Sequence, residues 1–369
     1  MSRRRERHHT VPRLHLRGFA GPYRGDSLRR SGQDPLLLVQ YDVNTGSRTD
    51  VSIADAAVAR NFYTIVLPDG TRSDAWERSL SNVENDIAPA LRRAIESPRF
   101  RLNDDDRQLL ASWIALQYLR GPDNRQLQAA IASFTVRAQV GMGGLAYLKH
   151  VMSKHLGRPV PPGRAERVWD DIMKEEGPTI KVRGEDHMKL LLQTFPQAAE
   201  QILGRTWGRM RFRQCALAVS DVPVGLVRDS VELWAGGGLG GARAITVPLD
   251  RHTLLWLALA GPGGPEEDMD LQATKAFAAA HNESAIGAAE RFVYFHPDDD
   301  PIAEGTVVPR PPRERLNVSS GFKLDGNRDR ALNDVLQQIA DRNGRNDGSL
   351  IADYTWPIDG YEPPANWDA

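Results

Sequence analysis

Strand-like segments occur in two distant parts of the hydrophobic and polar pattern of this chain. In the N-terminal part, residues 34–53 predict two short strands around a turn at 44–46. Residues 60–66 predict a further strand, followed by turn residues at 68–71. The C-terminal part carries more strand-like segments, over residues 209–228, 242–261 and 291–295.

Between these parts, hydrophobic residues recur at helical spacing. The clearest stripe consists of Trp76, Leu80, Ile87, Leu91 and Ile95. The next helix is expected to start at the acidic residues 104–106, which suit the positive end of a helix dipole, and to stop at Gly121 and Pro122. Further helices are expected over residues 124–155 with a break at 141–144, over 184–207 and over 270–289.

This arrangement predicts an α+β fold, in which strands from the N-terminal and C-terminal parts of the domain surround a central helical region. We expect a single domain at residues 1–300, with its helical middle at 74–206. The composition changes beyond residue 300. Residues 301–369 are expected to form a Pro-rich tail with one short helix at 328–342, docked through its aromatic side chains.

Composition narrows the function classes. The 369 residues are 41% hydrophobic, enough to bury a sizeable core, and the net charge of −1 excludes a globally basic nucleic-acid binder. Cys215 is the single cysteine, so no disulfide framework is possible within the chain and a cytoplasmic location is expected. No apolar run reaches membrane-spanning length, which predicts a soluble protein without a membrane partner.

Two charged residues occupy positions where a helical pattern expects apolar ones. Glu84 lies on the stripe with Leu80 and Ile87, and Arg120 is in step with Trp113 on the next helix. Buried carboxylates and guanidiniums are rarely unpaired. The two residues therefore either form a structural ion pair between the helices or line a polar cavity.

Three more polar residues are candidates for chemistry. Asp221 ends an apolar strand directly before Val222 and Pro223, a place that suits a metal-ligating or general-base carboxylate and equally a turn former. Asn282 interrupts an Ala-rich helix and needs a polar partner nearby. His9 lies in the basic segment before the rigid Pro12, so this end of the chain is expected to be structured.

Several short motifs, in a specific order, resemble a family of bacterial and archaeal proteins, the domain-of-unknown-function family numbered 4238. They are the histidine-x-Val-Pro element at 9–12, the Leu-Arg-x-Phe element at 16–19, an Asn-Phe-Tyr element at 61–63 and a Ser-Asp-x-Pro-Val strand at 220–224. The resemblance covers residues 8–298. It implies that His9, Glu84, Asp221 and Asn282 belong to one domain, and it implies no activity.

The candidate residues favour a hydrolase that acts on a phosphodiester, such as a nuclease. His9 would be the general base or a metal ligand, and Glu84 and Asp221 would bind a divalent ion such as Mg²⁺ or Mn²⁺. Arg120 would hold phosphate oxygens of a nucleic acid or a phosphorylated small molecule, and Asn282 would orient His9 or a water.

Two alternatives use the same residues. One is a non-catalytic module that binds a ligand or nucleic acid. The other is a purely structural network, in which His9 and Asp221 form a buried hydrogen bond that fixes the N-terminal segment. We expect His9 to face Asp221 or Glu84.

Overall fold

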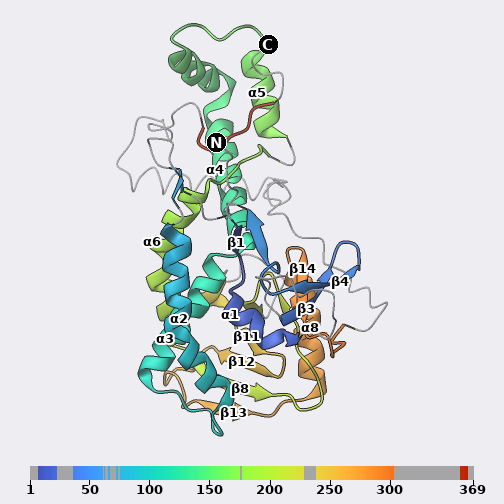
Figure 1. Ribbon diagram of the computed structural model, residues 1–369. Coiled ribbons are helices and arrows are strands. Elements are labelled where there is room, and N and C mark those ends of the chain that lie inside the picture. Colours follow the sequence, from blue (N-terminus) through green and yellow to red (C-terminus); the bar gives the residue numbers. More distant parts are fainter. Residues whose placement is uncertain are drawn as a thin grey trace. The chain divides into compact units, whose positions relative to one another are not determined.

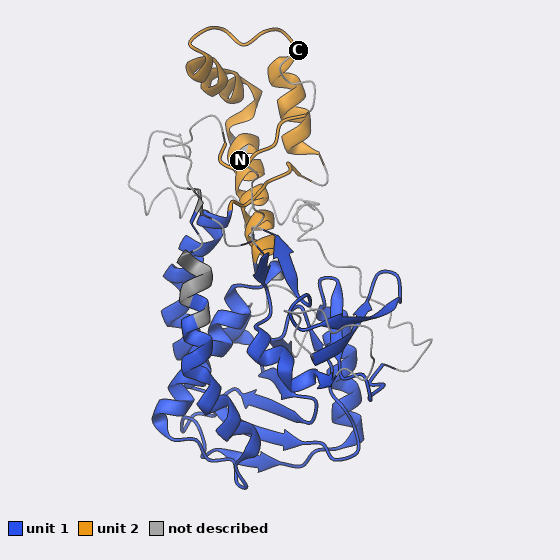
Figure 2. Cartoon of the chain, in the orientation of Figure 1, with its two compact units in different colours: residues 1–124, 184–311 blue, residues 125–183, 312–369 orange. Residues whose placement is uncertain are grey.

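The computed structural model describes residues 7–22, 36–60, 62, 65–66, 72–73, 75–174, 177–227, 238–302 and 358–364. The chain divides into two compact units, residues 1–124 with 184–311 and residues 125–183 with 312–369 (Figure 2). The predicted boundary at residue 300 stays a prediction, because residues 303–357 lie outside the described part.

The first unit contains both larger sheets. It begins with β1 (Arg7–His9), α1 (Arg13–Leu16), the 3₁₀ turn η1 (Arg17–Phe19), β2 (Gly21–Pro22), β3 (Leu36–Asp42), β4 (Arg48–Ser52), β5 (Val58–Arg60), β6 (Ile65–Val66) and β7 (Arg72–Ser73). Its longer helices are α2 (Ala75–Glu96), α3 (Asp104–Leu119), α6 (Gly184–Leu203) and α8 (Lys275–Ala288), with the short α7 (Gly238–Gly241). Its later strands are β8 (Thr206–Arg211), β9 (Val219–Ser220), β10 (Gly225–Val227), β11 (Ala244–Asp250), β12 (Thr253–Ala258), β13 (Met269–Leu271) and β14 (Phe292–Phe295).

One sheet joins the two ends of the domain. Its strand order is β2-β3-β14-β9, with β4 also paired to β3 (Figure 1). β3 and β14 are antiparallel, so that Val39 lies opposite Phe295 although they are far apart in sequence. Strands from the N-terminal and C-terminal parts thus meet around the helices between them, and the predicted α+β fold is confirmed.

The hairpin of β3 and β4 follows the predicted turn. The Asp42 carboxylate accepts a hydrogen bond from the backbone N–H of Asn44 at 2.9 Å. Gly46 has a φ of 71°, a conformation that glycine adopts without the steric cost of a side chain. The turn residues therefore determine where β3 ends.

The second sheet has the order β10-β11-β12-β8-β13, with β13 parallel to β8 and the other pairs antiparallel. Its buried side chains include Trp207, Val247 and Leu255, which share one hydrophobic core with Trp113 of α3 and Ile87 of α2. The helices that carry Glu84 and Arg120 are therefore packed against this sheet.

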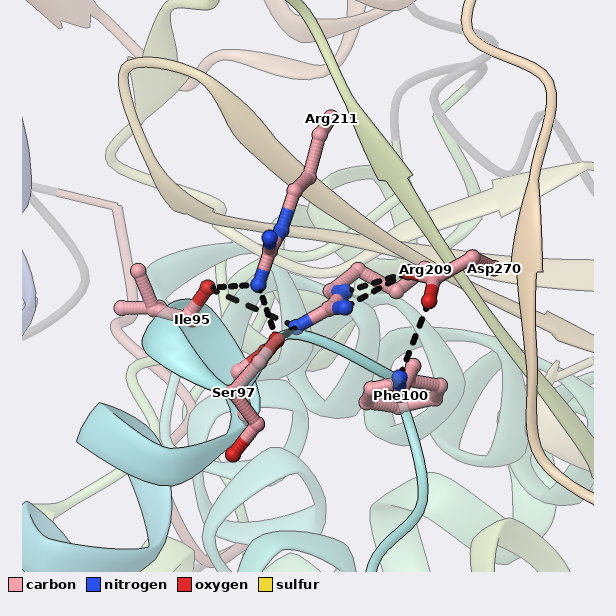
Figure 3. Close-up of polar contacts among 7 residues, drawn as sticks. Ile95, Ser97, Phe100, Arg209, Arg211 and Asp270 are labelled. Atoms are coloured by element: carbon pink, nitrogen blue, oxygen red, sulfur yellow. Dashed lines mark hydrogen bonds and ion pairs between the residues drawn. The ribbon is translucent and has the colours of Figure 1, made fainter.

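A cluster of polar contacts secures the C-terminal end of α2 to β8 (Figure 3). The guanidinium of Arg209, which is fully buried, donates to the backbone carbonyls of Ala94 and Ser97 at 2.9 Å each. Arg209 also donates to Asp270 at 2.8 Å, and Asp270 accepts from the backbone N–H of Phe100. The positive charge lies at the negative end of the α2 dipole, where it stabilises the helix.

The helix boundaries follow local signals. Asn103 caps α3 by accepting from the backbone N–H of Asp106 at 2.7 Å, and residues 104–106 form the acidic first turn that the sequence predicts. α3 ends at Leu119, so Arg120 occupies the position directly after it. Gly121 and Pro122 follow, as predicted, and Pro122 begins the next helix.

The second unit is helical. It contains most of α4 (Pro122–Leu156), together with α5 (Arg164–Met173). Gly144, at φ 72° and ψ 172°, interrupts α4 within the predicted break. In the described part of the tail, Tyr361 donates from its hydroxyl to Asp171 at 2.9 Å, while the helix predicted at 328–342 lies outside the described residues.

Candidate functional site

The N-terminal segment is an ordered part of the core. β1 pairs antiparallel with β5, and the backbone N–H of Thr10 donates to the Ala57 carbonyl at 2.8 Å. Val11 and Phe19 are fully buried. At Gly18 the chain passes so close to β11 that a Cβ would lie 2.8 Å from the carbonyl oxygen of Leu249. The expectation of a structured segment is confirmed.

His9 faces a backbone carbonyl. Its Nδ1 lies 3.1 Å from the carbonyl oxygen of Ala56, in the turn between β4 and β5. Burial, together with the positive charges of Arg13, Arg7 and Arg120, lowers the pKa of His9 from 6.5 to about 4. The imidazole is therefore neutral at neutral pH. Among the described residues no hydrogen bond joins His9 to Asp221 or Glu84, so the structural alternative with a buried bond between His9 and Asp221 is wrong.

Glu84 and Arg120 form the predicted ion pair between α2 and α3. Glu84 Oε1 lies 3.6 Å from Arg120 Nη1, which is longer than a hydrogen bond. The side chain of Arg120 is 2% exposed, and that of Glu84 is 23% exposed. Burial raises the pKa of Glu84, and the charges of Arg120 and Arg13 partly offset this rise. The predicted pairing is confirmed.

The Arg120 guanidinium is buried but makes few hydrogen bonds. Its Nη2 donates to Gln117 Oε1 at 3.1 Å, and its Nε has no hydrogen-bond partner within the described ranges. The indole Nε1 of Trp113, about two turns before Arg120 on the same helix face, likewise has no hydrogen-bond partner there. α3 therefore presents buried N–H donors that this part of the protein does not use.

His15 and Arg13 join this group from the N-terminal segment. His15 Nε2 lies 2.5 Å from the carbonyl oxygen of Pro248, and its ring meets the ring of Trp113 edge-on at 5.0 Å. Burial is the main cause that lowers the pKa of His15 to about 4, with a contribution from Arg120.

We call this group the Arg120 centre. Contacts and charge interactions join five of its members, which are His15, Glu84, Trp113, Gln117 and Arg120. His9 and Arg13 are included because of their electrostatic interactions with Arg120 and Glu84, respectively. Arg13 and His15 were not among the residues predicted from the sequence. The helical turn that Pro12 begins is the signal that could have placed His15 on a buried face.

Asp221 has a structural role elsewhere in the first unit. Its carboxylate accepts the backbone N–H groups of Glu290, Arg291 and Phe292 at 2.7, 2.8 and 3.0 Å. Burial raises the pKa of Asp221, and these three hydrogen bonds act in the opposite direction. The residue thereby joins the end of β9 to the start of β14, which is the turn-forming alternative that its sequence context allowed.

The side chain of Asn282 also forms hydrogen bonds with the backbone. Its Oδ1 accepts from the N–H of Ala218 at 2.9 Å, and its Nδ2 donates to the carbonyl of Ala216 at 3.0 Å. The expected polar partner is thus present. The expected role of Asn282 in orienting His9 is wrong, because both ends of the amide are engaged with the strand β9 region.

The predicted metal site is not assembled. Among the residues that the structure describes, no three His, Cys, Asp or Glu side chains lie together in a way that could hold a metal ion. His9 and Glu84 belong to the Arg120 centre, whereas the carboxylate of Asp221 is bound by three backbone amides.

The fold and the centre define an α+β protein with a buried, cation-rich polar site. A family model described as "Protein of unknown function (DUF4238)" matches residues 7–299, and the chain belongs to this family. The match confirms the resemblance expected over residues 8–298. No curated protein and no solved structure matches the chain. Over the described ranges, every helix is too short or too polar to cross a membrane.

Proposed function

We propose that the protein is a phosphoester hydrolase and that the Arg120 centre binds the phosphate group of its substrate. The observation that supports this most is the unused capacity of a buried guanidinium. Arg120 has five N–H donors, and in the described part of the chain they meet one hydrogen bond and one ion pair of 3.6 Å. A phosphate group would fill this capacity, since its oxygens match a guanidinium two at a time.

Charge supports an anionic ligand. Arg13 and Arg120 both lower the pKa of His9, and both act on Glu84. These two positive charges outweigh the single carboxylate of Glu84. Because the site is largely removed from water, the attraction for an incoming anion is stronger than at the surface. A phosphodiester or a phosphorylated small molecule satisfies this requirement.

His9 and Glu84 would carry the proton transfers. A water molecule gives one proton to Nε2 of His9 while its oxygen attacks phosphorus, and the bond from phosphorus to the leaving oxygen breaks. Burial and the negative charge of the bound phosphate both raise the pKa of Glu84, so it enters this step as the carboxylic acid and gives its proton to that oxygen. The products are an alcohol and a phosphate with one ester bond fewer. The negative charge of the bound phosphate would raise the pKa of His9 again, because it offsets the charges of Arg13 and Arg120.

One observation favours a second candidate, a binding module without turnover. A histidine with a pKa of about 4 is a weak base at neutral pH, and only the bound anion would restore its basicity. In that case the Arg120 centre would recognise a phosphorylated ligand or a nucleic acid and leave it intact.

A hydrolysis assay separates the two candidates. We would test the full chain on a chromogenic phosphodiester, single-stranded DNA and RNA, each without added metal and with Mg²⁺ or Mn²⁺. The variant is His9→Gln. The matched control is His252→Gln, since Nδ1 of His252 also lies near a backbone carbonyl, that of Cys215, at 3.2 Å.

We expect hydrolysis by the wild type and by His252→Gln, and a loss of about 100-fold or more in His9→Gln. Phosphate binding with no turnover on any substrate would support the binding module instead. If His9→Gln cleaves as fast as the wild type, His9 is not the general base. A wild type that neither cleaves these substrates nor binds phosphate contradicts both candidates.

A further inference from the structure

We propose that the turn Ser52–Ala57, held by Tyr294, is a positioning device that fixes His9 in the tautomer with the proton on Nδ1. The lone pair is then on Nε2, the nitrogen that would accept the proton in hydrolysis. This inference rests on the proposed function for its catalytic meaning. The tautomer itself is a property of the ligand-free protein.

The hydrogen bond of His9 determines which ring nitrogen carries the proton. Its Nδ1 lies 3.1 Å from the carbonyl oxygen of Ala56, and a carbonyl oxygen only accepts. Nδ1 must therefore carry the proton. In metal and catalytic sites the same bond to a backbone carbonyl often sets the role of the other ring nitrogen.

The residue after Ala56 has an unusual backbone conformation. Ala57 has a φ of 52°, and among the described residues it is the non-glycine residue in this left-handed region. An L-residue with a side chain rarely adopts this conformation, and it persists only where the surroundings enforce it. The observed outlier lies directly after the carbonyl that binds His9.

Hydrogen bonds on every side enforce the conformation. The Ala57 N–H donates to the hydroxyl oxygen of Tyr294 at 3.0 Å. The Ala57 carbonyl accepts from the N–H and the hydroxyl of Thr10 at 2.8 and 3.1 Å. On the other side of Ala56, Asp55 accepts from the hydroxyl of Ser52 at 2.8 Å and from Arg7 at 2.5 Å. The Ala56 carbonyl is therefore held between two anchored residues.

Tyr294 connects the turn to a strand that is distant in the sequence. It belongs to β14 and is fully buried, whereas the turn follows β4. Burial, with a contribution from the Asp221 carboxylate, raises the pKa of Tyr294, so its hydroxyl stays protonated at physiological pH. Asp221 in turn binds the backbone at the start of β14. Asp221 is therefore connected to His9 indirectly: it binds the start of β14, β14 carries Tyr294, and Tyr294 binds the turn whose carbonyl accepts from His9.

The test is a direct reading of the His9 tautomer. The ¹⁵N shifts of the imidazole nitrogens distinguish a protonated nitrogen from one with a lone pair, and we would record them on the ligand-free full chain at neutral pH. Tyr294→Phe removes the hydroxyl that binds the Ala57 N–H. Tyr41→Phe is the matched control on the same sheet, because no hydrogen bond to the Tyr41 hydroxyl is found in the described part of the chain.

We expect the wild type and Tyr41→Phe to hold the proton on Nδ1, and Tyr294→Phe to show a mixture of both tautomers. In the hydrolysis assay, Tyr294→Phe should lower kcat by about tenfold with KM nearly unchanged, because the phosphate contacts of Arg120 are retained. A wild-type His9 with the proton on Nε2 overturns the inference. So does a Tyr294→Phe variant that folds and keeps the wild-type shifts.

A second pair of variants covers the case in which Tyr294→Phe does not fold. Ala57→Gly suits the left-handed conformation and should keep the Nδ1 tautomer, whereas the β-branched Ala57→Val opposes it and should mix the tautomers. If the two variants give the same ¹⁵N shifts for His9, the conformation of the turn does not control the tautomer. If the wild type holds the Nδ1 tautomer but neither binds nor cleaves phosphoesters, the proposed function fails and the positioning remains.

Discussion

Replacing His15 by glutamine tests whether the Arg120 centre is as deeply buried as the structure indicates. His15 is fully buried, and its Nε2 lies 2.5 Å from the carbonyl oxygen of Pro248. The side-chain amide of glutamine has an N–H group at a similar position and can keep this hydrogen bond, but it cannot take up a proton. The variant therefore removes the titration of one residue and little else.

The magnitude follows from the pKa of His15 in the folded protein, which burial lowers from 6.5 to about 4. Between pH 4 and 6.5, His15 is protonated in the unfolded chain and neutral in the folded protein. His15 therefore contributes stability above pH 6.5 that is lost as the pH falls toward 4. The full loss amounts to about 3 kcal/mol at 1.36 kcal/mol per pH unit, and about 2 kcal/mol of it is lost by pH 5.

The assay is urea unfolding of both proteins at pH 8, 7, 6 and 5. Other titrating groups, including Glu84 and Asp221, are common to both proteins and cancel in the difference. The free energy of unfolding of the wild type relative to His15→Gln should be constant from pH 8 to 7 and fall by about 2 kcal/mol at pH 5. Parallel curves over the whole range would show that His15 is accessible to protons, and would refute the reasoning.

Three further variants test the structural assignments. Asp221→Ala leaves three backbone amides without their acceptor, so the free energy of unfolding should fall by about 3 kcal/mol or more with phosphate affinity unchanged, which urea unfolding and calorimetry measure. Asn282→Ala should cost about 2 kcal/mol by urea unfolding, because the Ala218 amide and the Ala216 carbonyl lose their partner; a loss below 0.5 kcal/mol would contradict this. Arg209→Met leaves Asp270 without its cation and leaves Arg211 as the remaining arginine at the end of α2, and we expect a loss of about 3 kcal/mol, reduced when Asp270→Leu is combined with it. A loss in the double variant equal to the sum of the losses in Arg209→Met and Asp270→Leu alone would show that the two side chains act independently.

Most of the fold could be predicted because its elements depend on local signals. The Asn-Thr-Gly turn, the acidic start of α3 and the Gly121-Pro122 end each determine a boundary through the backbone of a few neighbouring residues. The pairing of β3 with β14 could be expected only as a class of fold, because nothing in either segment specifies its distant partner.

The candidate site could be predicted only in part. The pairing of Glu84 with Arg120 could be predicted from the sequence, because both residues interrupt an apolar helical face and buried opposite charges tend to pair. The role of Asp221 could not be predicted, because a carboxylate after a strand has the same sequence context whether it binds a ligand or backbone amides. The partner of His9 is a carbonyl, which every residue has, and the positive φ of Ala57 has no signal in its sequence.

Calorimetric titration of the ligand-free protein with inorganic phosphate at pH 7 tests the central claim most directly. We would compare the wild type with Arg120→Lys, Glu84→Gln and His252→Gln. Arg120→Lys should weaken binding at least tenfold, because it loses the paired donors, and Glu84→Gln should strengthen it about tenfold, because it removes a negative charge beside the anion. His252→Gln should bind as the wild type does. Equal affinities in all four proteins, or no binding by the wild type, would contradict a phosphate site at Arg120.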